Sequence, residues 1–221
     1  MATALITGAN RGIGLALSQQ LSARGDTVIA VVRKPSQELS ALNGIRIESA
    51  VDVTNAEHIQ QLAQRLEGEA IDLLINNAGV LTRETLEDLN IDQIRFQFEV
   101  NALGPLRITH ALLPNLINGS KVAIITSRMG SIEDNTSGSR YGYRMSKAAV
   151  NMAGMSLARD LAPRGIPVAL LHPGYVRTKL TNQNGLINPD ESAEGLIARI
   201  DGLNLDNSGT FWHANGTVLP W

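Results

Sequence analysis

The chain has 221 residues, of which 43% are hydrophobic and 18% charged, and its formal net charge is −2. This length fits one α/β domain, residues 1–221, and the weak charge gives no support to nucleic-acid binding or attraction to a membrane surface. The absence of cysteine excludes disulfides, thiolate metal sites and a cysteine nucleophile. Because no apolar run could span a bilayer and the chain enters its first strand almost at once, we expect a soluble cytoplasmic protein.

The first element is a short apolar strand, Ala4 to Ile6, followed by a loop that contains Gly8, Gly12 and Gly14 and opens a helix. Glycines let the backbone turn tightly and leave no side chain in the way of a phosphate. The N–H groups that begin the next helix then face the anion. The loop therefore favours a nucleotide site, with a plain strand-to-helix turn as the alternative.

Strand-like and helix-like stretches alternate along the chain, which predicts a doubly wound, mainly parallel sheet with helices on both faces. Strands are expected over residues 27–32, 45–51, 71–75, 122–126 and 168–171, and helices over 13–25, 91–116 and 143–161. Gly104-Pro105 should bend or break the second helix. Thr54 to Glu57 looks like a capping box at the start of a helix, and Asn215-Gly216 like a turn between two short strands.

The last of these helices begins with Tyr143 and Lys147, and a four-residue offset puts both on one helix face. A lysine ammonium near a phenol favours the phenolate, which lowers the tyrosine pKa and makes it an acid or base near neutral pH. An ordinary helix-surface pair is the alternative. Tyr141 competes for the role, but Met145 stands four residues after it instead of a base.

Ser127 stands at the end of the fifth strand, where ligands bind in an open parallel sheet. A hydroxyl there can donate to a carbonyl oxygen and hold it for protonation. Ser131 is a weaker candidate because it has left the strand end, and either serine could simply bond to nearby backbone. A hydrolase is disfavoured because no Gly-x-Ser-x-Gly elbow surrounds Ser127. The four histidines are scattered and lack the spacing of metal ligands.

Five motifs of this chain resemble, in their order, those of the short-chain dehydrogenase/reductase family. They are Thr7-Gly8-x-x-x-Gly12-x-Gly14, Asn76-Asn77-Ala78-Gly79, Asn101, Ser127 with Tyr143-x-x-x-Lys147, and Pro173-Gly174-x-x-x-Thr178. The resemblance covers essentially the whole chain. It implies a Rossmann-type fold and a nicotinamide cofactor.

The resemblance also implies catalytic roles for four residues. Tyr143 would donate a proton to the substrate carbonyl in the reducing direction, and Ser127 would orient that carbonyl. Lys147 would lower the pKa of Tyr143 and bond the nicotinamide ribose. Asn101 would hold a water that links Lys147 to solvent. The alternative for Asn101 is a helix kink beside Gly104-Pro105.

Further residues would contact the cofactor if the resemblance holds. The glycine loop would hold the pyrophosphate, the residues after the third strand the adenine, those after the fourth strand the riboses, and those after the sixth the nicotinamide. The full set is Gly8, Asn10, Arg11, Gly12, Ile13, Gly14, Arg33, Asp52, Val53, Asn77, Ala78, Gly79, Tyr143, Lys147, Pro173, Gly174, Val176 and Thr178. For Asp52, a turn or cap beside Thr54 is the alternative.

The end of the second strand separates NAD from NADP, because an acidic residue there bonds the ribose 2′-hydroxyl and an arginine accommodates a 2′-phosphate. This strand ends in Val31-Val32-Arg33-Lys34-Pro35, without a carboxylate, and Arg11 in the glycine loop could add a second guanidinium. Arginine matches two phosphate oxygens at once. We therefore predict NADPH/NADP+ as cofactor, the alternative being two solvated surface arginines.

Two segments depart from the common pattern of the family. Ser127 and Tyr143 are 16 positions apart, more than in many members, so Glu133 to Gly138 should form a polar surface loop beside the active site. The segment after Thr178, which covers the substrate in this family, is short. This suggests an open site for carbonyl compounds of modest size.

The stretch 127–132 and the ending 216–221 look like the compact carbonyl-reductase branch, which includes Sniffer-type reductases and proteins resembling C-factor. We expect reduction of a small aldehyde or ketone with NADPH. The alternative is an NAD(P)-binding signalling protein with little or no turnover. Family members often assemble through the helices that contain Asn101 and Tyr143, so a homodimer or homotetramer is expected, without metal, nucleic acid or membrane partners.

Overall fold

The computed structural model describes all 221 residues and contains one seven-stranded sheet in the order β3-β2-β1-β4-β5-β6-β7. Every neighbouring pair of strands is parallel. The strands are β1 (Thr3–Thr7), β2 (Thr27–Val31), β3 (Ile45–Glu48), β4 (Leu73–Asn76), β5 (Lys121–Ile125), β6 (Val168–His172) and β7 (Phe211–His213). The order reverses between β1 and β4, which opens a crevice beyond the carboxyl ends of these strands. This arrangement confirms the predicted Rossmann-type fold.

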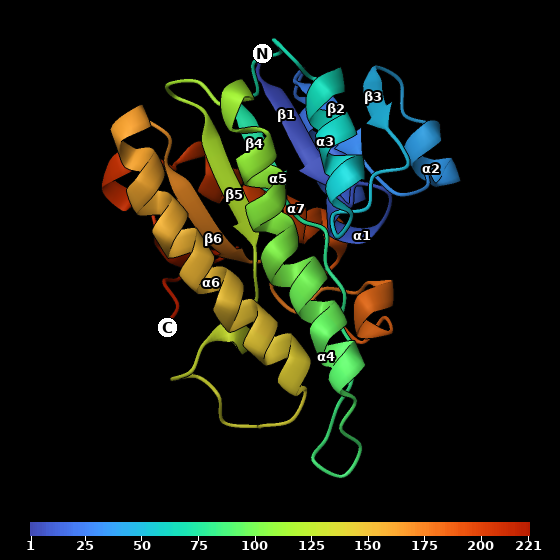
Figure 1. The fold of residues 1–221 in the computed structure, drawn as a ribbon, viewed down its shortest axis with the longest axis vertical. Helices are drawn as coiled ribbons and strands as arrows, with labels where there is room; N and C mark the ends of the chain where they lie inside the picture. The colour runs from blue at the N-terminus through green and yellow to red at the C-terminus, as the bar shows by residue number, and fades with distance from the viewer.

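Helices cover both faces of the sheet. They are α1 (Gly12–Ala23), α2 (Gln37–Ser40), α3 (Ala56–Arg65), α4 (Ile91–Phe98), α5 (Gly104–Ala111), α6 (Tyr141–Leu161) and α7 (Pro189–Asp201). Figure 1 shows α3, α5 and α6 in front of the sheet and α1 and α7 behind it. None of the helices is long and apolar enough to cross a membrane.

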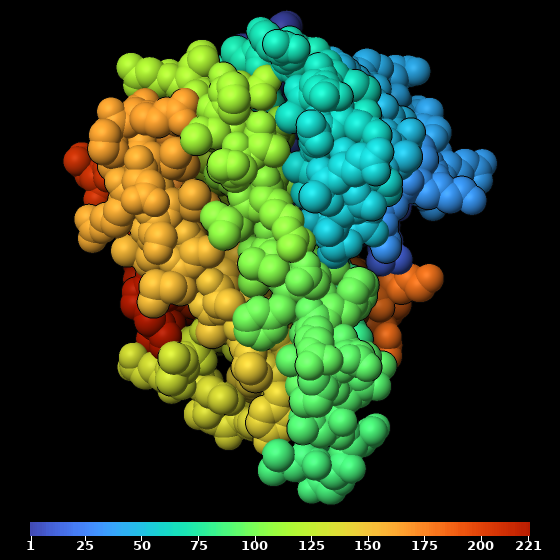
Figure 2. All heavy atoms as spheres, in the orientation of Figure 1, coloured from blue at the N-terminus to red at the C-terminus, as the bar shows by residue number.

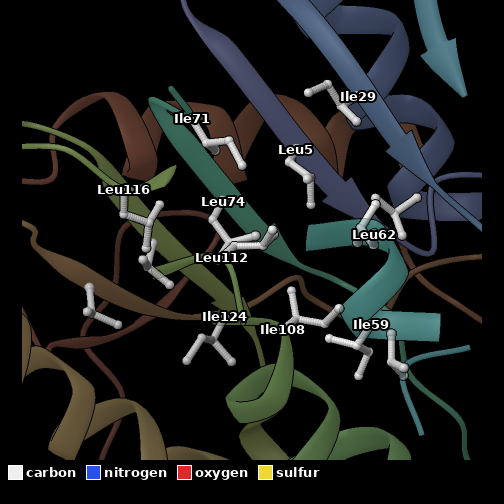
Figure 3. Packing of buried hydrophobic residues seen from close by; sticks show 14 of the residues in the cluster. Leu5, Ile29, Ile59, Leu62, Ile71, Leu74, Ile108, Leu112, Leu116 and Ile124 are labelled. Carbon is white, nitrogen blue, oxygen red and sulfur yellow. The ribbon is translucent and has the colours of Figure 1, made fainter. Parts of the chain in front are cut away.

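Alternate residues of the strands supply two cores, one on each face of the sheet, because successive side chains of a strand point to opposite sides. On one face, fully buried side chains of the strands pack against α3 and α5 (Figure 3), and they include Leu5, Ile29, Leu74 and Ile124. On the other face, Ile6, Val28 and Ile75 pack with residues of α1 and α7. The double burial explains why these strands read as continuous apolar runs.

The predicted break in the long helix of residues 91–116 lies just before Gly104-Pro105. α4 ends at Phe98, a π-helical turn spans Glu99–Leu103, and α5 follows. Pro105 has no N–H, so it cannot donate to the carbonyl of Asn101 four residues earlier. The π turn places Asn101 in the interior, where its side chain is fully buried.

The structure differs from expectation at the start of α3 and at the chain end, and it contains two helices that were not expected. The capping box at Thr54 is wrong by one residue, since Asn55 caps α3 by accepting from the His58 N–H at 3.1 Å. Helices α2 and α7 were not expected. The turn at Asn215-Gly216 is present, but its first strand, β7, joins the sheet edge in parallel and meets the following stretch only in one bridge, Trp212 to Val218.

Candidate active site

A cavity of about 590 Å³ lies at the carboxyl edge of the sheet, in the crevice where the strand order reverses. All the residues predicted to contact the cofactor line it except Gly174 and Val176. Val176 is buried beneath the cavity rim in a bridge to Ile187, and Gly174 turns the chain with φ at 87°. One cavity therefore brings together residues that come from five separate strand ends.

The glycine loop forms one end of this cavity, and its two turns pack closely on each other. A Cβ added at Gly14 would lie 2.3 Å from the Gly8 carbonyl oxygen, so no side chain fits at that position. Arg11 precedes α1 without a side-chain cap, and the first turn of α1 contains no acidic residue. The N–H groups of this turn are therefore open to an anion in the cavity, as a dinucleotide pyrophosphate requires.

Asn77 joins the glycine loop to the end of β4. Its side-chain nitrogen donates to the carbonyls of Thr7 at 2.9 Å and Gly8 at 3.2 Å. The Thr7 hydroxyl accepts from the N–H groups of Asn77 and Ala78. These bonds fix residues 77–79 against the glycine loop, where a bound ribose would lie.

Arg33 and Asp52 stand together at the adenine end. Nη1 of Arg33 is 3.8 Å from Oδ2 of Asp52, and 66% of the Arg33 side chain is exposed. Oδ1 of Asp52 also accepts from the N–H and hydroxyl of Thr54. Partial burial raises the pKa of Asp52, but the Thr54 bonds and the Arg33 charge outweigh it and hold the pKa below its ordinary value. Asp52 thus closes a turn, as the alternative expected, and also lines the cavity.

Tyr143 and Lys147 line the other end of the cavity, and Ser127 is buried next to the lining residue Thr126. Tyr143 and Lys147 are buried on one face of α6, with Nζ of Lys147 5.7 Å from the centre of the Tyr143 ring. Nζ donates to the carbonyl oxygen of Ile125 at 2.8 Å. The Ser127 side chain is near enough to the Tyr143 phenol to lower the pKa of that phenol. The phenol and the neighbouring hydroxyl can therefore act on one substrate oxygen.

The acidities of this pair differ from the sequence-based expectation. Burial raises the pKa of Tyr143 to about 12, more than the Ser127 bond and the Arg140 charge lower it. Burial also lowers the pKa of Lys147 to about 8. The expected depression of the Tyr143 pKa is wrong for this state, because desolvation of the phenol outweighs the groups that lower its pKa. Tyr143 therefore carries its proton at neutral pH.

Asn101 connects the loop after β4 to α6. Its Oδ1 accepts from the Val80 N–H at 2.9 Å, and its Nδ2 donates to the Val80 carbonyl at 2.9 Å and to the Ser146 hydroxyl at 3.0 Å. All the polar atoms of the Asn101 side chain are thus engaged with protein. The kink in the helix is real, whereas the water-holding role that the family resemblance implies stays a prediction.

Ser131 is engaged away from the cavity. Its hydroxyl donates to the carbonyl oxygen of Trp221 at 3.0 Å and accepts from the Asp134 N–H. The N–H groups of Ile132 and Glu133 donate to the same Trp221 oxygen, each at 2.9 Å. The geometry therefore favours Ser127 over Ser131. Likewise Tyr143 lines the cavity and Tyr141 does not.

Sequence reasoning missed a buried carboxylate, Glu84, that holds the start of α6. Its Oε1 accepts from Gln97 at 2.9 Å and from the Thr82 hydroxyl, and its Oε2 accepts from the Gly142 N–H at 3.3 Å. α6 has no acidic residue in its own first turn and no side-chain cap from Arg140. Glu84 thus supplies the missing negative group beside Tyr143 from a distant loop.

Sequence reasoning also missed the charged residues that flank Thr178. Arg177 and Lys179 line the cavity together with Leu180 and Gln183. Their position next to an expected cofactor residue was the available signal. No group of three or more His, Asp or Glu side chains converges as a metal site would require.

Comparison with known proteins places these features in a family. Residues 2–186 match the family model for short chain dehydrogenase. The chain is 45% identical to 1-hydroxy-2-glutathionyl-2-methyl-3-butene dehydrogenase of Rhodococcus sp. (strain AD45), with 100% of both chains covered. It is also 47% identical over 154 residues to C-signal of Myxococcus xanthus, and this match covers 68% of this chain and 93% of that protein.

Solved structures agree with these relatives. NADPH-bound carbonyl reductase from chicken fatty liver is 31% identical, with a TM-score of 0.92 and coverage of 100% of this chain and 99% of that one. The carbonyl reductase Sniffer of D. melanogaster is 28% identical, with a TM-score of 0.93 and full coverage of both chains. The resemblance drawn from the motifs is confirmed: this chain belongs to the short-chain dehydrogenase/reductase family of oxidoreductases.

Proposed function

We propose that the protein is an NADPH-dependent reductase that converts the carbonyl of a small aldehyde or ketone to an alcohol. One observation carries the proposal. A single cavity has the open amino terminus of α1 and Arg33 at one end, and the Tyr143 phenol with Lys147 at the other. The NADPH-bound carbonyl reductase of the same fold supports this choice of cofactor and reaction.

The residues present fit a nicotinamide dinucleotide. The first turn of α1 would hold its pyrophosphate, Arg33 and Arg11 its 2′-phosphate, and Lys147 its nicotinamide ribose. Gly14 lets the start of α1 pack closely against Gly8 and Asn77, which fixes the glycine loop at the cavity. When bound, the cofactor supplies the hydride that reaches the carbonyl carbon.

Two residues of the protein bind and protonate the carbonyl oxygen of the substrate. Ser127 donates a hydrogen bond to this oxygen and orients it, and the Tyr143 phenol gives it a proton as the alcohol forms. Because burial keeps Tyr143 protonated at neutral pH, the phenol is ready to act as an acid. The Lys147 ammonium, fixed by the Ile125 carbonyl, then stands near the phenolate that remains and stabilises it.

The test is a panel of aldehydes and ketones mixed with protein and NADPH, followed by nicotinamide absorbance. We expect oxidation of NADPH with at least one carbonyl compound. Measurable NADPH binding without oxidation by any substrate would contradict the proposal. That result would favour the second candidate, an NAD(P)-binding signalling protein with little turnover, which the similarity to C-signal supports.

The panel should also contain glutathionyl alcohols, assayed in the oxidising direction with NADP⁺ and NAD⁺. The Rhodococcus relative is named for the dehydrogenation of a hydroxy-glutathionyl butene, and it is similar over the full length of this chain. Turnover of these alcohols would extend the substrate class beyond simple carbonyl compounds.

A homodimer or homotetramer remains part of the proposal. Helices α4 and α6 pack side by side, and they expose Phe96, Met145 and Met152. Exposed apolar side chains on neighbouring helices suit an interface between copies of this chain. Light scattering coupled to gel filtration should give a mass of two or four chains, and a mass of one chain would contradict this assembly.

A further inference from the structure

One wall of the cavity is formed by residues 175–188, called here the cover segment, whose charged residues Arg177 and Lys179 have no role in the cofactor assignment. It crosses directly over the glycine loop, since a Cβ added at Gly12 would lie 3.1 Å from the methyl carbon of Thr178. In Figure 1 it is the orange turn below the α1 label, and in Figure 2 its atoms project beside the N-terminal region. The cover segment therefore faces the amino terminus of α1.

The cover segment is closed on itself. The Thr181 hydroxyl donates to the Val176 carbonyl at 2.6 Å and accepts from the Thr178 N–H at 3.1 Å. Its two ends meet where Leu186 N–H donates to the Tyr175 carbonyl at 2.6 Å. The backbone at residues 177–179 is thus held in place, and side chains from it start at a defined position over the cavity.

This fixed backbone presents two cations to the cavity. Arg177 and Lys179 both line it, and neither takes part in an ion pair. The Arg177 guanidinium donates only to the Asn188 side-chain oxygen, at 3.1 Å. Asp52 is the only carboxylate in the lining, and it is engaged by Arg33 and Thr54. Two uncompensated positive groups thus face a helix amino terminus, which is itself electropositive.

We propose that Arg177 and Lys179 form an anion clamp that holds the dinucleotide pyrophosphate from the side opposite α1. The inference rests on the nicotinamide cofactor of the proposed function and adds two binding residues to it. The contact between Thr178 and Gly12 puts the clamp at the glycine loop, where the pyrophosphate binds, and Arg33 occupies the separate position at the end of β2. Long cationic side chains on a fixed backbone can reach the phosphate oxygens that α1 leaves exposed.

The experiment uses calorimetric titration with both NADPH and NADH, because the two share the pyrophosphate and only NADPH has the 2′-phosphate. The proteins are the wild type, Arg177→Gln, Lys179→Gln and the control Arg159→Gln, which removes an exposed charge from the far end of α6. We expect each clamp variant to weaken both cofactors by about 3- to 10-fold, as loss of one partly screened charge contact implies. The NADPH/NADH affinity ratio of each clamp variant should equal that of the wild type. Arg159→Gln should bind both cofactors with wild-type affinity.

Different results separate the clamp from the proposed function. Unchanged affinities in both clamp variants, or an effect confined to substrate KM, would overturn the clamp and leave NADPH binding intact. A fall in the NADPH/NADH ratio would also overturn it, because the residues would then serve the 2′-phosphate. A wild-type protein that binds neither cofactor would remove the proposed function and the clamp together. Thermal melts check that the exposed substitutions leave the fold unchanged.

Discussion

The two ends of the cavity are built differently. At the phosphate end, the groups expected to meet the ligand are backbone N–H groups and exposed cations such as Arg33, two-thirds of whose side chain is in solvent. At the catalytic end, Tyr143, Lys147 and Asn101 are buried, and Lys147 and Asn101 bond to protein groups without any ligand.

This contrast assigns different tasks to the two ends. The catalytic end is ordered in advance, as proton transfer to a defined atom requires, since small displacements there reduce rates strongly. The phosphate end offers backbone N–H groups and solvent-exposed cations to a ligand that carries several charges of its own. Substitutions at the catalytic end should therefore change kcat or stability, and those at the phosphate end should change affinity.

The largest expected effect comes from Tyr143→Phe. Loss of the phenol removes the proton donor, so kcat should fall by about 10³-fold while the NADPH dissociation constant changes by less than about 2-fold. Stopped-flow turnover and cofactor titration measure the two quantities. Tyr141→Phe is the matched control and should keep wild-type activity, since Tyr141 does not line the cavity. Full activity in Tyr143→Phe would contradict the catalytic assignment.

The buried Lys147 should make stability depend on alkaline pH. Its folded pKa is about 8 and its ordinary value 10.5, so between these pH values the unfolded chain binds more protons. Wild-type stability should therefore rise through this window relative to Lys147→Met, by about 1.4 kcal/mol per pH unit. Urea unfolding at pH 8, 9 and 10 gives the difference. The exposed Lys179→Met should follow the wild type, and parallel curves for Lys147→Met would contradict burial of the ammonium.

Asn101→Ala should destabilise the protein by about 2 kcal/mol, because it leaves the partly buried Val80 N–H and carbonyl without their partner. Denaturant unfolding at neutral pH measures the change. Asn184→Ala, an exposed asparagine whose side chain makes no bond, is the control. Equal stability of the two variants would show that the Asn101 link contributes nothing to the fold.

Arg33→Asp should change cofactor choice with little effect on the catalytic end. A carboxylate at this position repels a 2′-phosphate, so the affinity for NADPH relative to NADH should fall by about 10- to 30-fold. Titration with both cofactors measures the ratio. Arg159→Asp, which also reverses a charge but lies outside the cavity and in no ion pair, is the control. Retention of NADPH affinity in Arg33→Asp would overturn the NADP assignment.

Much of the fold could be predicted because the parallel strands are buried on both faces and so read as apolar runs. The glycine loop and the pair Tyr143–Lys147 were visible because their chemistry depends on short spacings along the chain. The capping error at Thr54 arose because Asn55 can cap equally well, and local sequence does not decide between neighbouring caps.

The remaining features depend on contacts between distant residues. Glu84 is 58 positions from Gly142, whose N–H it accepts, so no local pattern could reveal its role at the start of α6. The raised pKa of Tyr143 follows from burial beneath neighbouring elements, which spacing along one helix does not show. The position of Lys179 opposite the glycine loop requires the packing of Thr178 on Gly12.

The hydrogen bonds that fix Trp221 have a practical consequence for work with this protein. Its carbonyl oxygen accepts hydrogen bonds from residues 131–133, which follow Ser127 closely. Its ring stacks on Phe211 with the ring centroids 5.4 Å apart. A purification tag joined after Trp221 would therefore begin against residues 131–133, in the loop that follows Ser127. A tag joined before Met1 would begin at the opposite edge of the sheet (Figure 1), which makes that end the safer point of attachment for kinetic work and for immobilisation.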